Sequence, residues 1–237
     1  RSHGMVLAAG GDELGHLQVS LEGEEWMDLG IDSGAEFLDV ASSGWTSVAV
    51  GVDGRISTSD DLVEWTEQVD DDGDLLYEED FHAVAYGGTG FIVVGEDGVK
   101  MWSSDGVIWE REPGTIPLYD VAWGETFFVA VGEGGARKQA DEGGNWATPV
   151  FGGDNLTGIA YGDGRWVAVG PGRSLISPDG QDWEAFPQEF DLERVAFGYE
   201  RFIATSSEGL YTSPDGIRWT PLEDGDAGAL ETIVFLP

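Results

Sequence analysis

The sequence predicts an all-β fold, a six-bladed β-propeller of four-stranded blades, and two repeated phrases predict it. In the first phrase a tryptophan follows Ser or Ala by six residues, with an acidic residue and usually a glycine between them. Successive tryptophans lie 39, 44, 37, 37 and 36 residues apart, a spacing typical of propeller blades. The motif tryptophans are Trp26, Trp65, Trp109, Trp146, Trp183 and Trp219.

The second phrase lies about 25 residues before the tryptophan and reads as an apolar stretch that ends in Ala, an aromatic residue and Gly. We interpret it as the innermost strand of a blade, with the small Ala where blades crowd toward the axis. An apolar second strand, a Gly-rich turn and a third strand follow each copy. The copies span residues 81–87, 118–124, 156–162 and 192–198.

The phrase that ends in tryptophan is predicted to be a structural turn. In the copy at 177–183, Pro178 sets the backbone at the second turn position, and the oxygens of Ser177 and Asp179 bond to turn amides. We expect the same of Asp105 and Asp215, and we expect the tryptophans to pack between blades. Two copies are weaker: Leu62 stands where Gly is expected, and the copy ending at Trp146 has Ala140, Glu142 and Gly143.

The two ends of the chain are predicted to complete one blade. Residues 5–10 resemble a second strand, and residues 230–235 repeat the innermost phrase with no blade after it. Pairing them closes the ring, because the C-terminal strand then completes the N-terminal blade and no open sheet edge remains. We therefore expect a single domain over 5–237, and residues 1–4 resemble a cloning remnant.

The Ser-acid-Gly-Trp phrase resembles the Asp-box, or bacterial neuraminidase repeat, of sialidases, sortilin-type receptors, xyloglucanases and photosystem assembly factors. It is one residue shorter between Asp and Trp than the sialidase form, and is similar to bacterial propellers with Ser-x-Asp-Gly-x-x-Trp. In that family the motif lies on the face opposite the ligand site, so the resemblance implies a fold and leaves function open. The Arg-Ile-Pro phrase of sialidases is absent, and we expect no sialidase.

The composition excludes several functions. The net charge is −35, from 46 acidic and 11 basic residues, which disfavours nucleic acid and anionic membrane surfaces. No apolar stretch is long enough to insert into a membrane. Cysteine is absent, which excludes disulfides and thiolate chemistry. We expect a monomer with a protein or glycan partner, placed outside the cell or in the periplasm, with the cytoplasm of a halophile as the alternative.

One acidic loop is a candidate calcium site. The connection between Trp65 and Val84 is about six residues longer than its counterparts and is rich in carboxylates. Such loops can hold Ca²⁺ with six to eight oxygen ligands, and Asp70, Asp72 and Glu79 fall at acceptable places. Gln68 stands where the first Asp of a calcium loop belongs, so a solvated insertion is the other interpretation. We expect no other cofactor.

The candidate ligand-binding residues lie in loops on the opposite side from the tryptophan turns. In propellers, the turns between second and third strands and the connections between blades share the face where ligands usually bind. His82 begins an innermost strand beside the acidic loop, and Arg137 and Arg173 either bind an anion or pair with neighbouring carboxylates. The candidates are His82, Glu96, Asp97, Tyr119, Glu133, Arg137 and Arg173.

The sequence therefore predicts a non-catalytic recognition or scaffold module that binds a ligand or partner through this loop-bearing face. The loops are 66–80, 95–98, 132–137 and 170–173, and a basic protein, a glycan or a cation is the expected occupant. No order of Ser, His and Asp indicates nucleophilic catalysis, and no catalytic residue is assigned. The alternative is a carbohydrate-active hydrolase or lyase that uses carboxylates on the same face.

Overall fold

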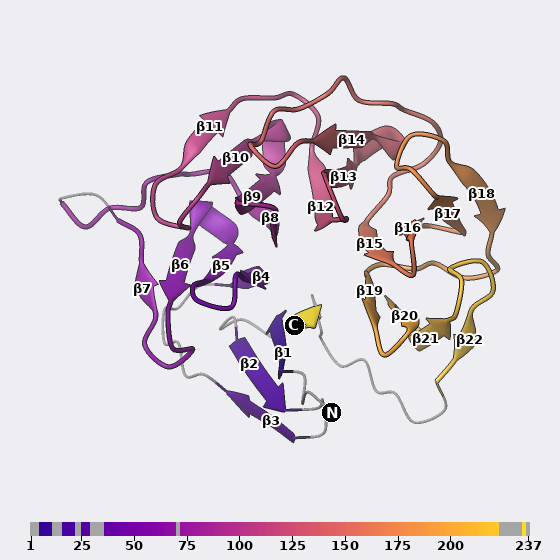
Figure 1. The fold of residues 1–237 in the computed structure, drawn as a ribbon, viewed down its shortest axis with the longest axis horizontal. Coiled ribbons are helices and arrows are strands. Elements are labelled where there is room, and N and C mark those ends of the chain that lie inside the picture. The colour runs from indigo at the N-terminus through magenta and orange to yellow at the C-terminus, as the bar shows by residue number, and fades with distance from the viewer. Residues whose placement is uncertain are drawn as a thin grey trace. The chain divides into compact units, whose positions relative to one another are not determined.

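The computed structural model describes the backbone of residues 5–10, 16–21, 25–28, 36–69, 72–222 and 234–235, and the side chains of residues 36–69 and 72–222. Contacts divide the chain into two compact units. Unit 1 holds residues 1–117 and 229–237, and unit 2 holds residues 118–228. Each unit contains three antiparallel sheets (Figure 1). The prediction of one closed domain over 5–237 stays a prediction.

Unit 1 contains three four-stranded sheets, each with the first strand of the repeat at one edge. The first sheet has the order β23-β1-β2-β3 and the others follow chain order. The strands of the first sheet are β1(Met5–Gly10), β2(His16–Leu21), β3(Glu25–Asp28) and β23(Val234–Phe235). Those of the second sheet are β4(Phe37–Ser42), β5(Ser47–Gly51), β6(Ile56–Ser59) and β7(Thr66–Glu67). Those of the third sheet are β8(Phe81–Gly87), β9(Gly90–Gly95), β10(Lys100–Ser103) and β11(Glu110–Glu112).

Unit 2 contains one three-stranded and two four-stranded sheets. Its strands are β12(Leu118–Trp123), β13(Phe128–Gly132) and β14(Arg137–Ala140); then β15(Gly158–Gly162), β16(Arg165–Gly170), β17(Arg173–Ser177) and β18(Glu184–Pro187); then β19(Val195–Gly198), β20(Arg201–Ser206), β21(Gly209–Ser213) and β22(Thr220–Pro221). Three short 3₁₀ turns, η1(Val52–Gly54), η2(Glu96–Gly98) and η3(Glu133–Gly135), follow second strands. In the described part of the chain no helix has the length and apolar character needed to cross a membrane.

The all-β prediction is confirmed, but the prediction that every sheet has four strands is not. The sheet of β12 to β14 lacks a fourth strand, although residues 141–157 are all described. Only two isolated bridges replace it, Ala140 with Trp146 and Arg137 with Val150. Gly143 and Gly144 favour a turn over a strand, and Pro149 offers no backbone N–H to a ladder.

Second strands are the most buried strands in the described part of the chain. Every residue of β5, β9 and β13 is buried, and these strands are nearly continuous apolar sequences. Such sequences are expected where a sheet is covered on both sides. In unit 1 Phe81 and Phe91 belong to a core with residues of the neighbouring sheet, and in unit 2 Trp166 and Phe202 belong to equivalent clusters.

A carboxylate that is buried in unit 1 and half-buried in unit 2 ties neighbouring first strands together in each unit. A register shift at the start of β4 turns Asp39 inward, where it is 6% exposed. Its Oδ1 accepts the N–H of Val40 at 2.9 Å, and its Oδ2 accepts the N–H of Val84 on β8 at 2.8 Å. Asp120 on β12 repeats this arrangement with Ile159 on β15 at 2.7 Å. The sequence analysis missed both residues, although each is an acid inside an otherwise apolar phrase.

We expect Asp39→Ala to lower the free energy of unfolding by about 1.5–3 kcal/mol, because a hydrogen bond to a charged group is lost and a buried N–H of β8 keeps no acceptor. Equilibrium denaturation in urea measures the change. Glu64→Ala, which removes an exposed carboxylate from the turn of the same sheet, is the control and should have little effect. Equal losses in both variants would contradict the role of Asp39.

The chain ends meet in one sheet. Strand β23 pairs antiparallel with β1, through Val6 with Phe235 and Leu7 with Val234. Because β2 occupies the other side of β1, removal of β23 leaves β1 as an unpaired sheet edge.

We expect deletion of residues 229–237 to lower the melting temperature strongly, since it removes β23 and exposes the backbone of β1. Thermal unfolding followed by circular dichroism measures the shift. Deletion of residues 236–237 alone leaves β23 in place and serves as the matched control. If the longer deletion melts at the same temperature as the shorter one, β23 contributes nothing to the fold.

Candidate functional site

The turns of each sheet fall at two ends, which we name by their contents. The Asp-turn end carries the turns between first and second strands and between third and fourth strands. The loop end carries the turns between second and third strands and the connections to the next sheet. This division follows from the antiparallel strand order.

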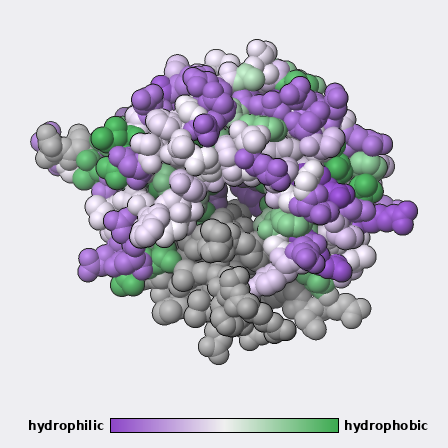
Figure 2. All heavy atoms as spheres, in the orientation of Figure 1, coloured by the Kyte–Doolittle hydropathy of each residue, from purple (hydrophilic) through white to green (hydrophobic). Residues whose placement is uncertain are grey.

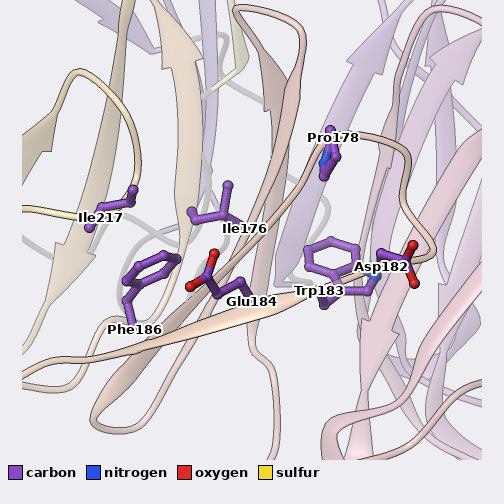
Figure 3. Close-up of a pocket in the computed structure, with 7 residues that line it drawn as sticks. All are labelled: Ile176, Pro178, Asp182, Trp183, Glu184, Phe186 and Ile217. Carbon is purple, nitrogen blue, oxygen red and sulfur yellow. The ribbon is translucent and has the colours of Figure 1, made fainter.

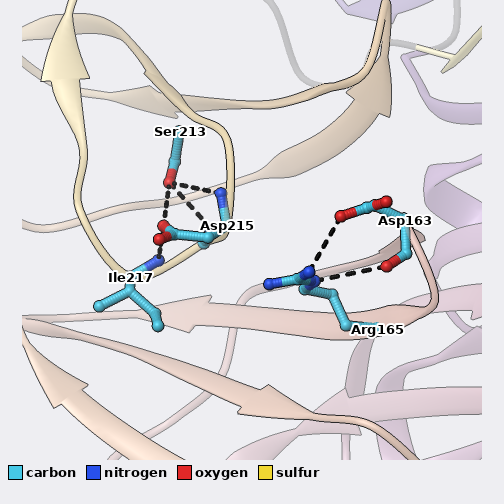
Figure 4. A network of polar contacts seen from close by, with 6 residues as sticks. Asp163, Arg165, Ser213, Asp215 and Ile217 are labelled. Atoms are coloured by element: carbon cyan, nitrogen blue, oxygen red, sulfur yellow. Dashed lines mark hydrogen bonds and ion pairs between the residues drawn. The ribbon is translucent and has the colours of Figure 1, made fainter.

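At the Asp-turn end, serine and aspartate side chains are bonded to the backbone of their own turn. In the turn of residues 213–219, Ser213 Oγ accepts the N–H of Gly216 at 2.8 Å and donates to Asp215 Oδ1 at 3.1 Å (Figure 4). Asp215 Oδ1 also accepts the N–H of Ile217 at 2.9 Å. Equivalent bonds are made by Ser59 with Asp61, Ser103 with Asp105, and Ser177 with Asp179.

These bonds hold the aspartates in their charged form. Hydrogen bonds from turn amides lower the pKa of Asp61, Asp105 and Asp179. Burial raises the pKa of Asp215, but the amides of its turn, the Ser213 hydroxyl and the positive charge of Arg165 lower it overall. Arg165 itself forms an ion pair with Asp163 at 2.9 Å (Figure 4). The turn carboxylates are therefore committed to local structure.

The two weaker copies of the motif differ in an informative way. Leu62 adopts φ 62° where the other copies use Gly106, Gly180 or Gly216, so the turn keeps its backbone shape without glycine. In the copy ending at Trp146, Asp141 rather than Glu142 accepts the turn amides, from Gly143 at 2.9 Å and Asn145 at 3.0 Å. Ala140 supplies no hydroxyl to favour the usual geometry.

Two of the described motif tryptophans, Trp183 and Trp219, are bonded to their own turns, and the described ones are not equally buried. Trp219 is 8% exposed, and its Nε1 donates to the carbonyl of Gly216 at 3.0 Å. Trp183 makes the same bond to Gly180 at 3.0 Å, and Trp109 donates to Gln68 Oε1 at 3.2 Å. Trp65 and Trp146 are half-buried, while the side chain of Trp26 on β3 lies outside the described residues. Packing of all six between blades stays a prediction.

Trp183 also lines a groove of about 360 Å³ along the outer strand β18 (Figure 3). Ile176, Phe186 and Ile217 form its apolar part, and the carboxylates of Asp182 and Glu184 lie at its edge. The groove is therefore built from two neighbouring sheets of unit 2.

At the loop end, side-chain oxygens hold the turns between second and third strands. Asp80 Oδ1 accepts the N–H of Asp53 in η1 at 2.8 Å, and Asn155 Oδ1 accepts the N–H of Gly134 in η3 at 2.9 Å. Asp191 Oδ1 accepts the N–H of Gly172 at 2.9 Å. Each acceptor stands just before or near the first strand of the next sheet, so this end of each sheet is fixed by its neighbour.

In unit 1 the candidates lie around η2 and the acidic loop. His82 is half-buried at the start of β8, and Glu96 and Asp97 are exposed in η2. Glu79 forms an ion pair with Arg111; burial raises its pKa, but hydrogen bonds and this partner lower it overall. Within the described ranges no three His, Asp or Glu residues are placed to hold a metal. Asp72 is exposed and Asp70 lies outside the described residues, so the calcium site stays a prediction.

In unit 2 the structure brings the candidates together as two pairs, Tyr119 with Glu133 and Arg137 with Arg173. Burial raises the pKa of Tyr119, and the negative charge of Glu133 raises it further. Arg137 lies 6.0 Å from the centre of the Trp183 ring, and Arg173 donates to the carbonyls of Gly152 at 3.3 Å and of Asp154. Within the described side chains, residues 36–69 and 72–222, neither arginine forms an ion pair with a carboxylate.

The sequence analysis missed exposed apolar residues at both ends. At the loop end Val150 and Phe151 are each 52% exposed. At the Asp-turn end Trp45 is 87% exposed, in the turn before β5, which begins at Ser47. On the face drawn in Figure 2, hydrophilic residues dominate the coloured surface and hydrophobic ones form small separate groups.

The chain matches no protein-family model and no curated protein. Among solved structures it is similar to YCF48 bound to D1 peptide, with a TM-score of 0.61 and 19% identity over 79% of this chain and 67% of that chain. It is also similar to a chain of the nidogen/laminin complex, with a TM-score of 0.70 and 8% identity over 99% and 98%. These neighbours are β-propeller proteins. The chain has a propeller fold.

A third neighbour, YCF48 from Cyanidioschyzon merolae, has a TM-score of 0.59 and 17% identity over 83% of this chain and 71% of that chain. Identities this low carry the propeller fold and no more. The site must be judged from its own residues.

We expect Asp179→Asn to lower the free energy of unfolding at pH 7, while Asp182→Asn in the same turn has little effect, because the carboxylate of Asp179 accepts two turn amides and no such bond is described for Asp182. A carboxyl whose folded pKa lies below its unfolded value stabilises the fold above about pH 4 and loses that contribution as pH falls through the folded pKa. Urea denaturation at pH 7 and at pH 2.5 measures both variants. A destabilisation that persists unchanged at pH 2.5 would contradict the charge effect.

Proposed function

We propose that this chain is a non-catalytic recognition propeller that binds a peptide or protein partner through its loop end. We further propose that it is a six-bladed Asp-box propeller closed by the pairing of β23 with β1. Six sheets among the described residues, four copies of the serine–aspartate turn and the β1–β23 pairing support this architecture.

The observation that carries the functional proposal is the loop of residues 150–155. It follows the segment that forms only isolated bridges to β14 in place of a fourth strand, and it presents Val150 and Phe151, each 52% exposed. Exposed apolar side chains grouped on a loop of an otherwise acidic surface are typical of protein-binding sites.

This loop is held at both ends by backbone hydrogen bonds. Arg137 and Val150 exchange two bonds, at 2.8 and 2.9 Å, and the N–H of Leu156 donates to Gly132 at 3.1 Å. Between them the N–H of Gly152 donates to Gly134 at 3.3 Å. A loop fixed in this way loses little conformational entropy when a partner binds.

Partner binding also suits the fold. Two similar structures are YCF48 bound to D1 peptide and nidogen in a complex with laminin. Both similarities support partner binding as a use of this architecture.

The carbohydrate-active alternative is less well supported. A glycosidase uses a carboxyl group that stays protonated near neutral pH, which requires a raised pKa. Every described carboxyl with a shifted pKa has it lowered, and five of these six are aspartates that accept amides of their own turns. These carboxyls suit structural turns better than proton transfer.

The proposal predicts that selection from a displayed library of short random peptides yields binders that depend on the loop end. Phe151→Ser should abolish their binding, whereas Trp45→Ser at the Asp-turn end should not. Both side chains are exposed, so neither change should alter the melting temperature. Fluorescence anisotropy with labelled peptides measures the affinities.

Two results would overturn this function. Selected peptides that lose binding with Trp45→Ser but not with Phe151→Ser would place recognition at the wrong end, and a selection that yields no binder would leave the loop without a partner. Turnover of chromogenic glycosides that is lost on substitution of one carboxylate at the loop end would favour the hydrolase instead.

A further inference from the structure

Four described cations of this acidic chain form an ion pair with a carboxylate. The chain has 46 acidic and 11 basic residues, so a partner is available almost everywhere. The described ion pairs are Arg55 with Glu67, Lys100 with Glu112, Arg111 with Glu79, and Arg165 with Asp163. Arg137 and Arg173 form no such pair within the described residues.

Arg137 occupies the same place in its sheet as Lys100. Each stands three residues before the first residue of the tryptophan phrase, Ala140 or Ser103. Lys100 lies opposite Glu112 on the neighbouring strand and pairs with it at 3.5 Å. Arg137 lies opposite Val150. The carboxylate of unit 1 is thus replaced by an apolar side chain in unit 2.

Arg173 corresponds in the same way to Arg55. Each stands four residues before the first serine of its phrase, Ser177 or Ser59. Glu67, the partner of Arg55, lies opposite Ser57, two residues further along β6. The equivalent residue opposite Leu175 on β17 is Ala185. This second replacement leaves Arg173 with backbone carbonyls as its described acceptors.

The two guanidinium groups meet at adjacent glycines. A Cβ built on Gly152 would lie 3.7 Å from Arg137 Nη2, and one built on Gly153 would lie 2.1 Å from Arg173 Nη1. At position 153, where φ is 88°, a Cβ would displace the Arg173 guanidinium from this place. Burial lowers the pKa of Arg137 and the positive charge of Arg173 lowers it further, but arginine remains charged at neutral pH.

Two neighbouring, half-buried positive charges repel each other unless an anion lies near both. The Nε atoms of both side chains are buried and donate to no acceptor in residues 36–69 and 72–222. The Trp183 ring faces Arg137 at 6.0 Å and helps to hold it in place. Within the described residues the fold therefore holds two neighbouring positive charges, neither of which forms an ion pair with a carboxylate.

We propose that Arg137 and Arg173 form a binding subsite for a carboxylate attached to an apolar group. The inference rests on the proposed function, because it names the chemistry that the loop end recognises. The planar guanidinium matches the two oxygens of a carboxylate. A net charge of −35 repels a dianion such as phosphate more than a monoanion. Val150 and Phe151 offer the apolar contact beside the charges.

The test uses 3-phenylpropionate as the probe, with its neutral amide, acetate and inorganic phosphate as comparison ligands. Isothermal titration calorimetry at constant ionic strength measures each dissociation constant. We expect saturable 1:1 binding of 3-phenylpropionate, weaker binding of acetate, and none of the amide or of phosphate. Phosphate binding as tight as that of 3-phenylpropionate, or equal binding of the amide, would overturn the carboxylate assignment.

The variants test the two arginines directly. Arg137→Gln and Arg173→Gln should each weaken binding about tenfold or more, since each loses a charged hydrogen-bond partner. Arg201→Gln removes the same charge from an exposed position on β20 and should leave the affinity unchanged. An equal loss with Arg201→Gln would show that only the overall charge matters and would overturn the subsite.

A further variant keeps both charges. Gly153→Ala places a methyl group where Arg173 Nη1 lies and should weaken binding as much as Arg173→Gln, with the melting temperature recorded to confirm folding. Unchanged affinity in folded Gly153→Ala would contradict the geometry. If 3-phenylpropionate binds as expected but no displayed peptide does, the proposed function fails and the subsite stands. If peptides bind through Phe151 but no carboxylate binds, the subsite fails and the proposed function stands.

Discussion

The structure depends on satisfying backbone N–H groups where short antiparallel strands end. Each four-stranded sheet has three reversals and a connection, and every reversal leaves amides without a ladder partner. Side-chain oxygens supply the acceptors: Ser213 and Asp215 at the Asp-turn end, and Asp80, Asn155 and Asp191 at the loop end. Between the ends, Asp39 and Asp120 do the same for neighbouring first strands. Much of the acidic composition therefore serves the backbone.

This use of carboxylates limits what remains for function. An aspartate that accepts two or three amides is held ionised and is a poor proton donor at neutral pH. Arginines that lack such partners are therefore more informative than the many acids around them. Arg137 and Arg173 stand out because the same places in unit 1 hold paired cations, so the comparison of repeats within one chain identifies them without any relative.

The sequence was sufficient for features that repeat locally. Spacing of the tryptophans predicted all-β sheets, and the phrase at 177–183 predicted the bonds between side chains and turn amides. The partners of Asp39 and Arg173 could not be predicted, because they depend on cross-strand register and on which strand lies alongside. The missing fourth strand beside β14 was also unforeseen, since the spacing to Trp146 is regular and only Pro149 and the glycines mark the change.

That interrupted sheet has a wider consequence. A protein built from near-identical repeats offers the same surface several times over, which gives a partner no single place to dock. Where β14 has only isolated bridges on its outer side, residues 150–155 leave the pattern, and two of their carbonyls accept hydrogen bonds from Arg173. The absence of one outer strand is thus enough to give one repeat a surface that the other repeats do not have.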